Sequence, residues 1–411
     1  MTLRFRWDWE SAPGVRLAEV AATWCRLSID LDDASATLVE QRDGSGGPRR
    51  SIDVSAYPLA EYLAVNWWRM SVPAHLQSDH GVRFAGAGSG FAWPDLTLRN
   101  DHGLMWVTLR SRDKAPESVR FLTRAEAVLD AGATLEAVAG FIDATVRRLD
   151  DEGVKGTLLQ EEWAAIQQAD TAERDFCLVA AAWGQDPYDT PSDVAQLMLG
   201  AERRIGSAEL LADLARAVPL GQLAESADWL LEASGAEAPR RLEIPPLGPL
   251  DWSSAAGVAP WKIGYQRARR LRHLLGLEPT AEAPIDDLLT VGQTVSRAPL
   301  NIDALVQADG ESSLSVVVGA GTSATAKRFA SARVIGRHGL APVRGLSLLT
   351  RATQYTERAE RAFAAELLAP ADGIAELLDG DYSEDALQRA AQHFGVNPML
   401  VQHQVENQVA A

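Results

Sequence analysis

Near its C-terminus the chain reads Ala362-Phe363-Ala364-Ala365-Glu366-Leu367-Leu368-Ala369-Pro370. With the residues before it, this stretch predicts a helix over 356–368, because Pro370 cannot continue one. Periodicity and chain breakers predict the neighbouring elements: a strand at 313–318 and helices at 327–336, at 383–393 and from Asn397 onward. Helices mixed with a few strands indicate an α+β fold, with a small sheet in a mostly helical C-terminal part.

Three blocks of this region resemble the ImmA/IrrE metallo-endopeptidase family. Arg328-Phe329-Ala330-Ser331-Ala332 is similar to the run into its active helix, and residues 362–370 match its second helix closely. Ala391-Gln392-His393-Phe394-Gly395-Val396-Asn397-Pro398 resembles a third block. The resemblance covers about 255–411 and implies a zincin-like domain. Members of the family cleave regulators such as repressors and antitoxins, which implies a role in stress response, toxin–antitoxin control or phage defence.

The chain departs from that family where the chemistry would occur. In place of the zinc-binding His-Glu-x-x-His it has Arg333-Val334-Ile335-Gly336-Arg337. Two histidines at i and i+4 share one helix face and bind zinc, while the glutamate acts as general base on the metal-bound water. An arginine side chain has only donors and stays protonated, so it repels a cation. We therefore expect a degenerate peptidase domain without catalytic residues, metal or cofactor.

Two acids remain on the following helix, Glu357 and Glu360. Alignment on Phe363 puts Glu357 at the family's acidic third-ligand position. A carboxylate facing two arginines favours a bidentate ion pair, so we predict that Arg333 or Arg337 pairs with Glu357 or Glu360 and ties the two helices together. The alternative is that both arginines are exposed helix residues with solvated stems.

The function predicted on this basis is a non-catalytic regulatory or protein-interaction protein, with the degenerate domain as its binding scaffold. A strand edge at Leu314, Val316 and Val318 is the candidate site for an added peptide strand. The protein partner is unidentified, and an oligomer is possible.

Two alternatives stay open. A metal-dependent peptidase could use a relocated site among His75, His80 and His102. A transcriptional regulator could bind DNA through the helices on either side of Gly395, although the second of them, 399–408, contains neither Lys nor Arg. The basic helix 261–275, predicted to expose Arg267 and Arg272, is expected to pair with acidic helices of this chain or of a partner.

The chain divides into four predicted parts along its length. We expect a β-rich, aromatic-packed domain at 1–118, a helical domain at 119–235, a Pro/Gly linker at 236–251 and the ImmA/IrrE-like domain at 252–411. Seven of the twelve tryptophans precede residue 110, which favours a small aromatic core in the first part.

Composition narrows the classes of partner. The 411 residues include 39 Lys and Arg and 56 Asp and Glu, a net charge of −17 that makes nucleic-acid binding unlikely. No apolar run approaches the roughly 20 residues of a membrane span. With only two cysteines, Cys25 and Cys177, and no signal-peptide pattern, we expect a cytoplasmic protein.

Overall fold

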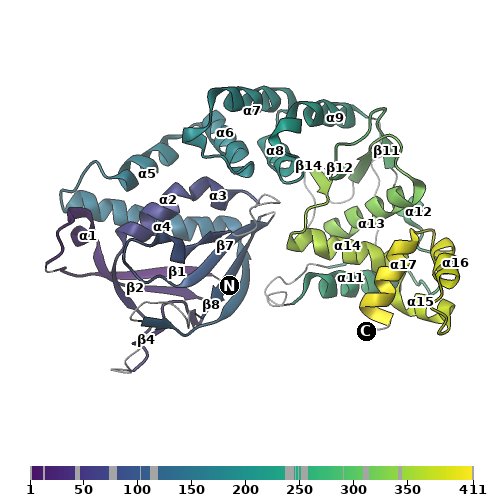
Figure 1. Ribbon diagram of the computed structural model, residues 1–411, viewed down its shortest axis with the longest axis horizontal. Helices are drawn as coiled ribbons and strands as arrows, with labels where there is room; N and C mark the ends of the chain where they lie inside the picture. Colours follow the sequence, from purple (N-terminus) through teal and green to yellow (C-terminus); the bar gives the residue numbers. More distant parts are fainter. Residues whose placement is uncertain are drawn as a thin grey trace. The chain divides into compact units, whose positions relative to one another are not determined.

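The computed structural model has an α+β fold that divides into two compact units, Met1–Thr190 and Pro191–Asp251 with Val258–Ala411 (Figure 1). We call them the N-terminal and the C-terminal unit. The structure describes residues 2–12, 14–41, 47–73, 81–101, 103–111, 119–236, 245, 247, 248, 250, 258–289, 291–308, 314–340 and 345–409. The predicted linker at 236–251 lies largely outside these ranges.

The N-terminal unit contains antiparallel sheets with helices packed against them. One sheet has the order β1-β2-β3 with β5 also on β2, a second has the order β10-β8-β7-β6, and β4 pairs with β9. The strands are β1 (Leu3–Trp9), β2 (Trp24–Leu31), β3 (Ala34–Ser35), β4 (Val39–Gln41), β5 (Ile52–Ser55), β6 (Val82–Arg83), β7 (Asp95–Asp101), β8 (Leu104–Arg110), β9 (Val119–Phe121) and β10 (Ala125–Asp130). The first helices are α1 (Ala18–Ala22), α2 (Tyr57–Val65) and α3 (Trp67–Ser71).

Aromatic side chains fill much of the interior of this unit. Phe84, Trp93, Phe121 and Phe141 are among the largest fully buried side chains of the described residues. The ring of Phe5 on β1 stacks on Phe141, with 4.8 Å between the ring centroids. Because Phe141 lies on a helix beyond residue 118, the aromatic core extends past the boundary predicted for the first domain.

The region predicted as one helical domain, 119–235, is divided between the two units. It begins with β9 and β10, and β10 pairs with β8 along its whole length, so the sheet of the N-terminal unit needs it. The helices up to residue 182 belong to the N-terminal unit and the later ones to the C-terminal unit. These helices are α4 (Ala131–Asp151), α5 (Leu158–Gln168), α6 (Thr171–Ala182), α7 (Ser192–Ile205), α8 (Ala208–Ala215) and α9 (Leu223–Gly235).

The sheet of the C-terminal unit has the order β11-β13-β12-β14. β13 (Leu314–Val318) pairs in parallel with β11 (Val291–Gln293) and antiparallel with β12 (Ile302–Ala308), and β14 (Gly345–Thr350) lies beyond β12. All residues of β13 are buried. The predicted peptide-binding edge at Leu314, Val316 and Val318 is therefore wrong, because a run of β-branched residues predicts a strand but not its place in the sheet.

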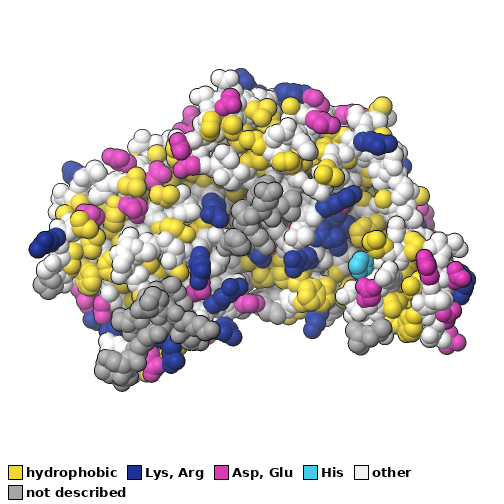
Figure 2. Space-filling view, in the orientation of Figure 1, with side chains coloured by type: hydrophobic (Ala, Val, Ile, Leu, Met, Phe, Trp, Pro, Cys, Tyr) yellow, Lys and Arg dark blue, Asp and Glu magenta, His cyan; other side chains and the backbone are white. Residues whose placement is uncertain are grey.

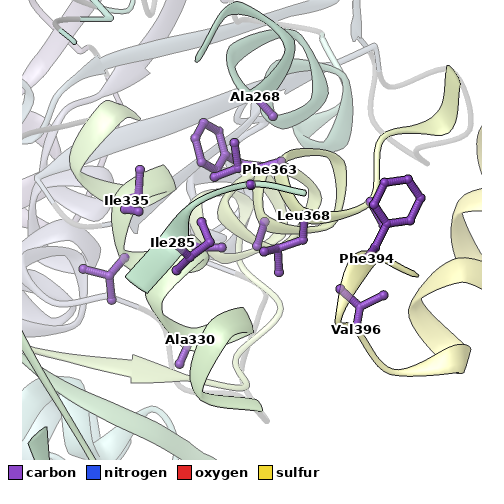
Figure 3. Close-up of a cluster of buried hydrophobic side chains, with 14 of the residues drawn as sticks. Ala268, Ile285, Ala330, Ile335, Phe363, Leu368, Phe394 and Val396 are labelled. Carbon is purple, nitrogen blue, oxygen red and sulfur yellow. The ribbon is translucent and has the colours of Figure 1, made fainter. Parts of the chain in front are cut away.

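Helix α14 (Tyr355–Leu368) is packed closely by α11 (Pro260–Leu274) and α13 (Ala324–Leu340). A Cβ on Gly264 of α11 would lie 2.2 Å from the Ala359 carbonyl, and a Cβ on Gly336 of α13 would lie 2.7 Å from the Phe363 ring. These two glycines allow the helices to approach. Phe363 is part of a buried apolar cluster, where it lies beside Ala268 of α11 (Figure 3).

The remaining helices extend this cluster toward the C-terminus. Phe394 and Val396, drawn in Figure 3, carry it to the junction of α16 and α17. The remaining helices are α12 (Ile285–Leu288), α15 (Ala371–Leu378), α16 (Glu384–Phe394), α17 (Pro398–Gln404) and a final turn at Val405–Val409. Among the residues that the structure describes, no helix is both long and apolar enough to cross a membrane.

Helix α11 corrects one prediction about the basic cluster. Arg267 and Arg272 are buried rather than exposed, with 7% and 5% of their surfaces accessible. Arg267 donates to the carbonyls of Leu247, Gly248 and Gly339, and Arg272 donates to four backbone carbonyls, including Leu367 at 2.8 Å. Arg269, in contrast, pairs with Glu366 at 2.7 Å, an acid of the same chain. Five donors let a guanidinium satisfy several buried carbonyls at once, which periodicity does not reveal.

Candidate functional site

The candidate site lies where α13 meets α14 and the sheet of the C-terminal unit. Arg333 and Arg337 are one helical turn apart on α13, so they project toward the same side. Glu360 is on the facing α14. Arg333 and Glu360 are 1% and 0% exposed, and the side chain of Arg337 is 12% exposed. The site is thus an interior cluster of charges at the junction of two helices.

Glu360 binds both arginines. Its Oε2 accepts from Nε of Arg337 at 2.7 Å, and its Oε1 accepts from Nη2 of the same residue at 3.3 Å. Oε1 also accepts from Nη2 of Arg333. Fork-shaped contact of this kind fixes geometry as well as charge. The structure thus brings Arg333, Arg337 and Glu360 together across the two helices.

The charge state of Glu360 follows from two opposed effects. Complete burial on its own would raise the pKa of this carboxyl. The positive charges of Arg337 and Arg333, with the hydrogen bonds they donate, outweigh burial and hold the pKa below its ordinary value. Glu360 is therefore ionised at neutral pH, and its negative charge offsets one of the two positive charges of its partners.

The arginines also bind the sheet. Arg333 donates to the Thr350 carbonyl of β14 at 2.7 Å and pairs with Asp303 of β12. Arg337 donates to the Leu348 carbonyl of β14, also at 2.7 Å. Each guanidinium therefore connects α13 to both α14 and the sheet. A metal ion, whose bonds are short, could connect only residues directly adjacent to it.

Glu357 has a different partner from the one predicted. This fully buried carboxylate pairs with Arg216, which follows α8 and is itself fully buried. Arg216 also pairs with Asp213 at 3.0 Å, and Asp213 accepts from the backbone N–H of Leu348 at 3.2 Å. Alignment on Phe363 favoured Glu357 as the acid opposite α13, but Glu360 occupies that place. The sequence signal for the second cluster was Asp213 and Arg216, charged residues three apart in a mostly apolar stretch.

The side chains at this junction can be compared with the ligands that zinc needs. The positions that carry histidines in the resembled family hold guanidinium groups, which offer no lone pair to zinc. Glu360 has both oxygens in hydrogen bonds to arginines. The residues present at the junction of α13 and α14 therefore do not fit zinc. Among the described residues, no three His, Cys, Asp or Glu side chains lie close enough together to hold a metal.

A cleft of about 1160 Å³ opens beside this junction. Its described lining includes four arginines, Arg297, Arg333, Arg351 and Arg361, and one carboxylate, Asp303. In Figure 2 basic side chains gather over the region where Figure 1 shows β12, α13 and α14. Sequence reasoning missed three of these four arginines, because they come from a loop, a strand end and a helix that are distant along the chain.

The other candidate residues lie elsewhere. His75, His80 and His102, proposed for a relocated metal site, are outside the described residues. Gly395 ends α16 with φ +62° and Asn397 caps α17, as expected of the turn between the two helices. Comparison with protein-family models and with curated proteins found no match to this chain.

Proposed function

We propose that the protein is a non-catalytic regulatory or protein-interaction protein, and that a degenerate ImmA/IrrE-like peptidase domain at 252–411, within its C-terminal unit, acts as the binding scaffold. One observation carries this proposal: Arg333 and Arg337, at the positions of the zinc ligands in the resembled family, are both bound to Glu360. The junction of α13 and α14 is held by ion pairs, and its charged groups are engaged with one another rather than directed at a substrate.

The mode of binding differs from strand addition to β13. On β14, the carbonyl of Leu348 accepts from Arg337 and its N–H donates to Asp213. These are the backbone groups that an added strand would need. Strand addition at the β14 edge would therefore have to displace these contacts, and on this proposal the partner binds through side chains at the surface of the C-terminal unit.

The biological setting follows from the resemblance alone. Regulators are the substrates of active family members, so we propose that this protein captures such a regulator, in stress response, toxin–antitoxin control or phage defence. We place this activity in the cytoplasm, since Cys25 and Cys177, the two cysteines of the chain, are both buried free thiols.

The experiment is affinity capture of a partner by the full chain, followed by intact mass spectrometry of the partner. Purified partner and protein are incubated with added zinc, and in parallel with a chelator. We expect a stable complex and an unchanged partner mass in both arms. Cleavage that needs zinc and stops with the chelator would overturn the proposal and favour a peptidase.

A further inference from the structure

We propose that the arginine-lined cleft of the C-terminal unit binds an organic phosphate, with the phosphate against Arg297, Arg351 and Arg361 and an apolar group against Phe329 and Met399. This inference rests on the charge and shape of the cleft. It does not depend on capture of a protein partner.

The cleft carries excess positive charge within an acidic chain. Among the residues that the structure describes, four guanidinium groups line it against one carboxylate, Asp303. Both oxygens of Asp303 are already bound, one to Arg333 and the other to Nε of Arg351 at 3.0 Å. With Asp303 and Glu360 both counted against these four arginines, two of their positive charges have no carboxylate partner among the described residues. In a chain whose total net charge is −17, such a local excess is unexpected unless an anion offsets it.

Arg361 is the arginine most in need of an anion. It is half-buried, and among the described residues no carboxylate forms an ion pair with it. Its Nη2 donates to the Ala352 carbonyl. Burial first, and then the charge of Arg333, lower the pKa of Arg361 to about 10, and the more distant carboxylates of Glu360 and Asp303 offset this only in part. A bound phosphate would relieve both effects, because it supplies a negative charge and acceptor oxygens to the same guanidinium.

The first turn of α13 adds to the same potential. Residues 320–323, which lead into this 17-residue helix, line the cleft. A Cβ on Gly321, at φ +76°, would lie 3.9 Å from Nε of Arg297, so this arginine extends along the helix start. Helix N-termini favour anions through their free N–H groups and dipole. Arg297 and the start of α13 thus form one wall of the cleft, and Arg351 and Arg361 contribute from elsewhere on its lining.

The apolar part of the ligand is indicated by a second pocket that continues the cleft. This pocket, of about 420 Å³, shares five lining residues with the cleft, including Phe329, Asn397 and Met399. Its other lining residues include Ala365 and Leu400. An aromatic ring and a thioether next to a cationic wall suit a flat heterocycle joined to a phosphate. We therefore take a nucleoside phosphate as the probe of the organic-phosphate class.

The same surface fits an acidic peptide less well. A peptide bound in an extended form would need backbone partners, and β13 is interior while the Leu348 groups of β14 are bound to Asp213 and Arg337. A small phosphate needs only the guanidinium forks and helix N–H groups that line the cleft.

The test is titration calorimetry of the full chain with ADP, with inorganic phosphate, with tripolyphosphate and with a glutamate-rich peptide, at 0.15 M salt. We expect ADP to bind at least tenfold more tightly than inorganic phosphate, and tripolyphosphate to compete with it. Substitution R361Q or R297Q should weaken ADP binding about tenfold, since each removes one charge-assisted contact. R361K should restore part of it, and R389Q, at an exposed site on α16, should leave it unchanged.

Several results would overturn the inference. ADP that fails to bind at 1 mM, or binds R297Q and R361Q as well as it binds the native chain, refutes the site. Equal affinity for ADP and inorganic phosphate refutes the apolar part, and tighter binding of the peptide refutes the phosphate class. Circular dichroism of each variant checks folding. If a captured partner still binds the R361Q variant while ADP does not, the cleft is separate from the proposed partner surface.

Discussion

The substitution E360Q tests whether the ion pairs at the junction of α13 and α14 stabilise the C-terminal unit. Glutamine keeps the size of the side chain and one acceptor oxygen. Its NH2 group, however, is a donor and would face the donor N–H groups of the arginines. Arg333 would then remain 1% exposed with only Asp303 as a charged partner, and Arg337 would lose its carboxylate at Glu360. The change therefore leaves buried positive charge that is poorly balanced.

The magnitude follows from this loss. Breaking a buried ion pair from one side costs about 3–5 kcal/mol. The other partners of the arginines, Asp303 and the carbonyls of Thr350 and Leu348, stay in place, so the lower half of that range is expected. For a domain of this size each kcal/mol lowers Tm by about 2–4 °C, so we expect a decrease of about 6–16 °C for a loss of about 3–4 kcal/mol.

Hydrogen exchange locates the effect, and thermal unfolding measures it. Peptides from α13 and α14 should lose protection in E360Q, while those from the N-terminal unit keep theirs. The matched control is E376Q, at an exposed position on α15, where no change beyond about 1 °C is expected. A native-like Tm and native-like protection in E360Q would refute the reasoning, because the ion pairs would then contribute nothing net.

Three further predictions concern the same unit. Because the pKa of Glu360 is lowered in the folded chain, its stabilisation is complete above the unfolded pKa of about 4.3 and is lost as the pH falls through the folded pKa. The difference in Tm between the native chain and E360Q should therefore narrow below about pH 4. A constant difference down to about pH 3 would contradict this. G336A should cost about 1–3 kcal/mol in urea unfolding, because its Cβ would lie 2.7 Å from Phe363, whereas G200A, with open space around it, should not destabilise; equal effects would count against close packing of α13 on α14. R333H with R337H should bind about one zinc per chain by mass spectrometry, with Glu360 as third ligand, and a folded variant that takes none would refute the resemblance of α13 to a zinc helix.

Helix positions could be predicted from the sequence, since each has a local signal. The apolar stretch ending at Pro370 predicted α14, and Gly395 predicted the end of α16. The approach of Arg333 and Arg337 to α14 was also predicted, but from the resemblance to a family whose two helices face each other there, since the i and i+4 spacing shows only that both arginines share a face. The pairing of Glu357 with Arg216 was not, because it depends on α8 packing beside β14, a contact between distant parts of the chain.

Burial of charged residues was the largest source of error. Arg267 and Arg272 read as the polar face of a helix, yet their guanidinium groups satisfy carbonyls in neighbouring loops. Periodicity measures which positions are apolar, and it cannot show that backbone acceptors lie within reach of a long polar side chain. The same limit hid the cleft, whose arginines come from separate elements.

The arginine junction and the cleft beside it differ in what they can bind. A catalytic zinc site keeps one position open for water or substrate. At the junction, both oxygens of Glu360 accept from arginines, and Arg333 and Arg337 also donate to carbonyls of the sheet, so these groups are already engaged within the fold. Arg361 and Arg297 line the cleft, and no carboxylate of the described residues forms an ion pair with either of them. Recognition of an anion is therefore expected from the cleft arginines, and substitution of these two should alter binding while leaving Tm nearly unchanged, the reverse of E360Q.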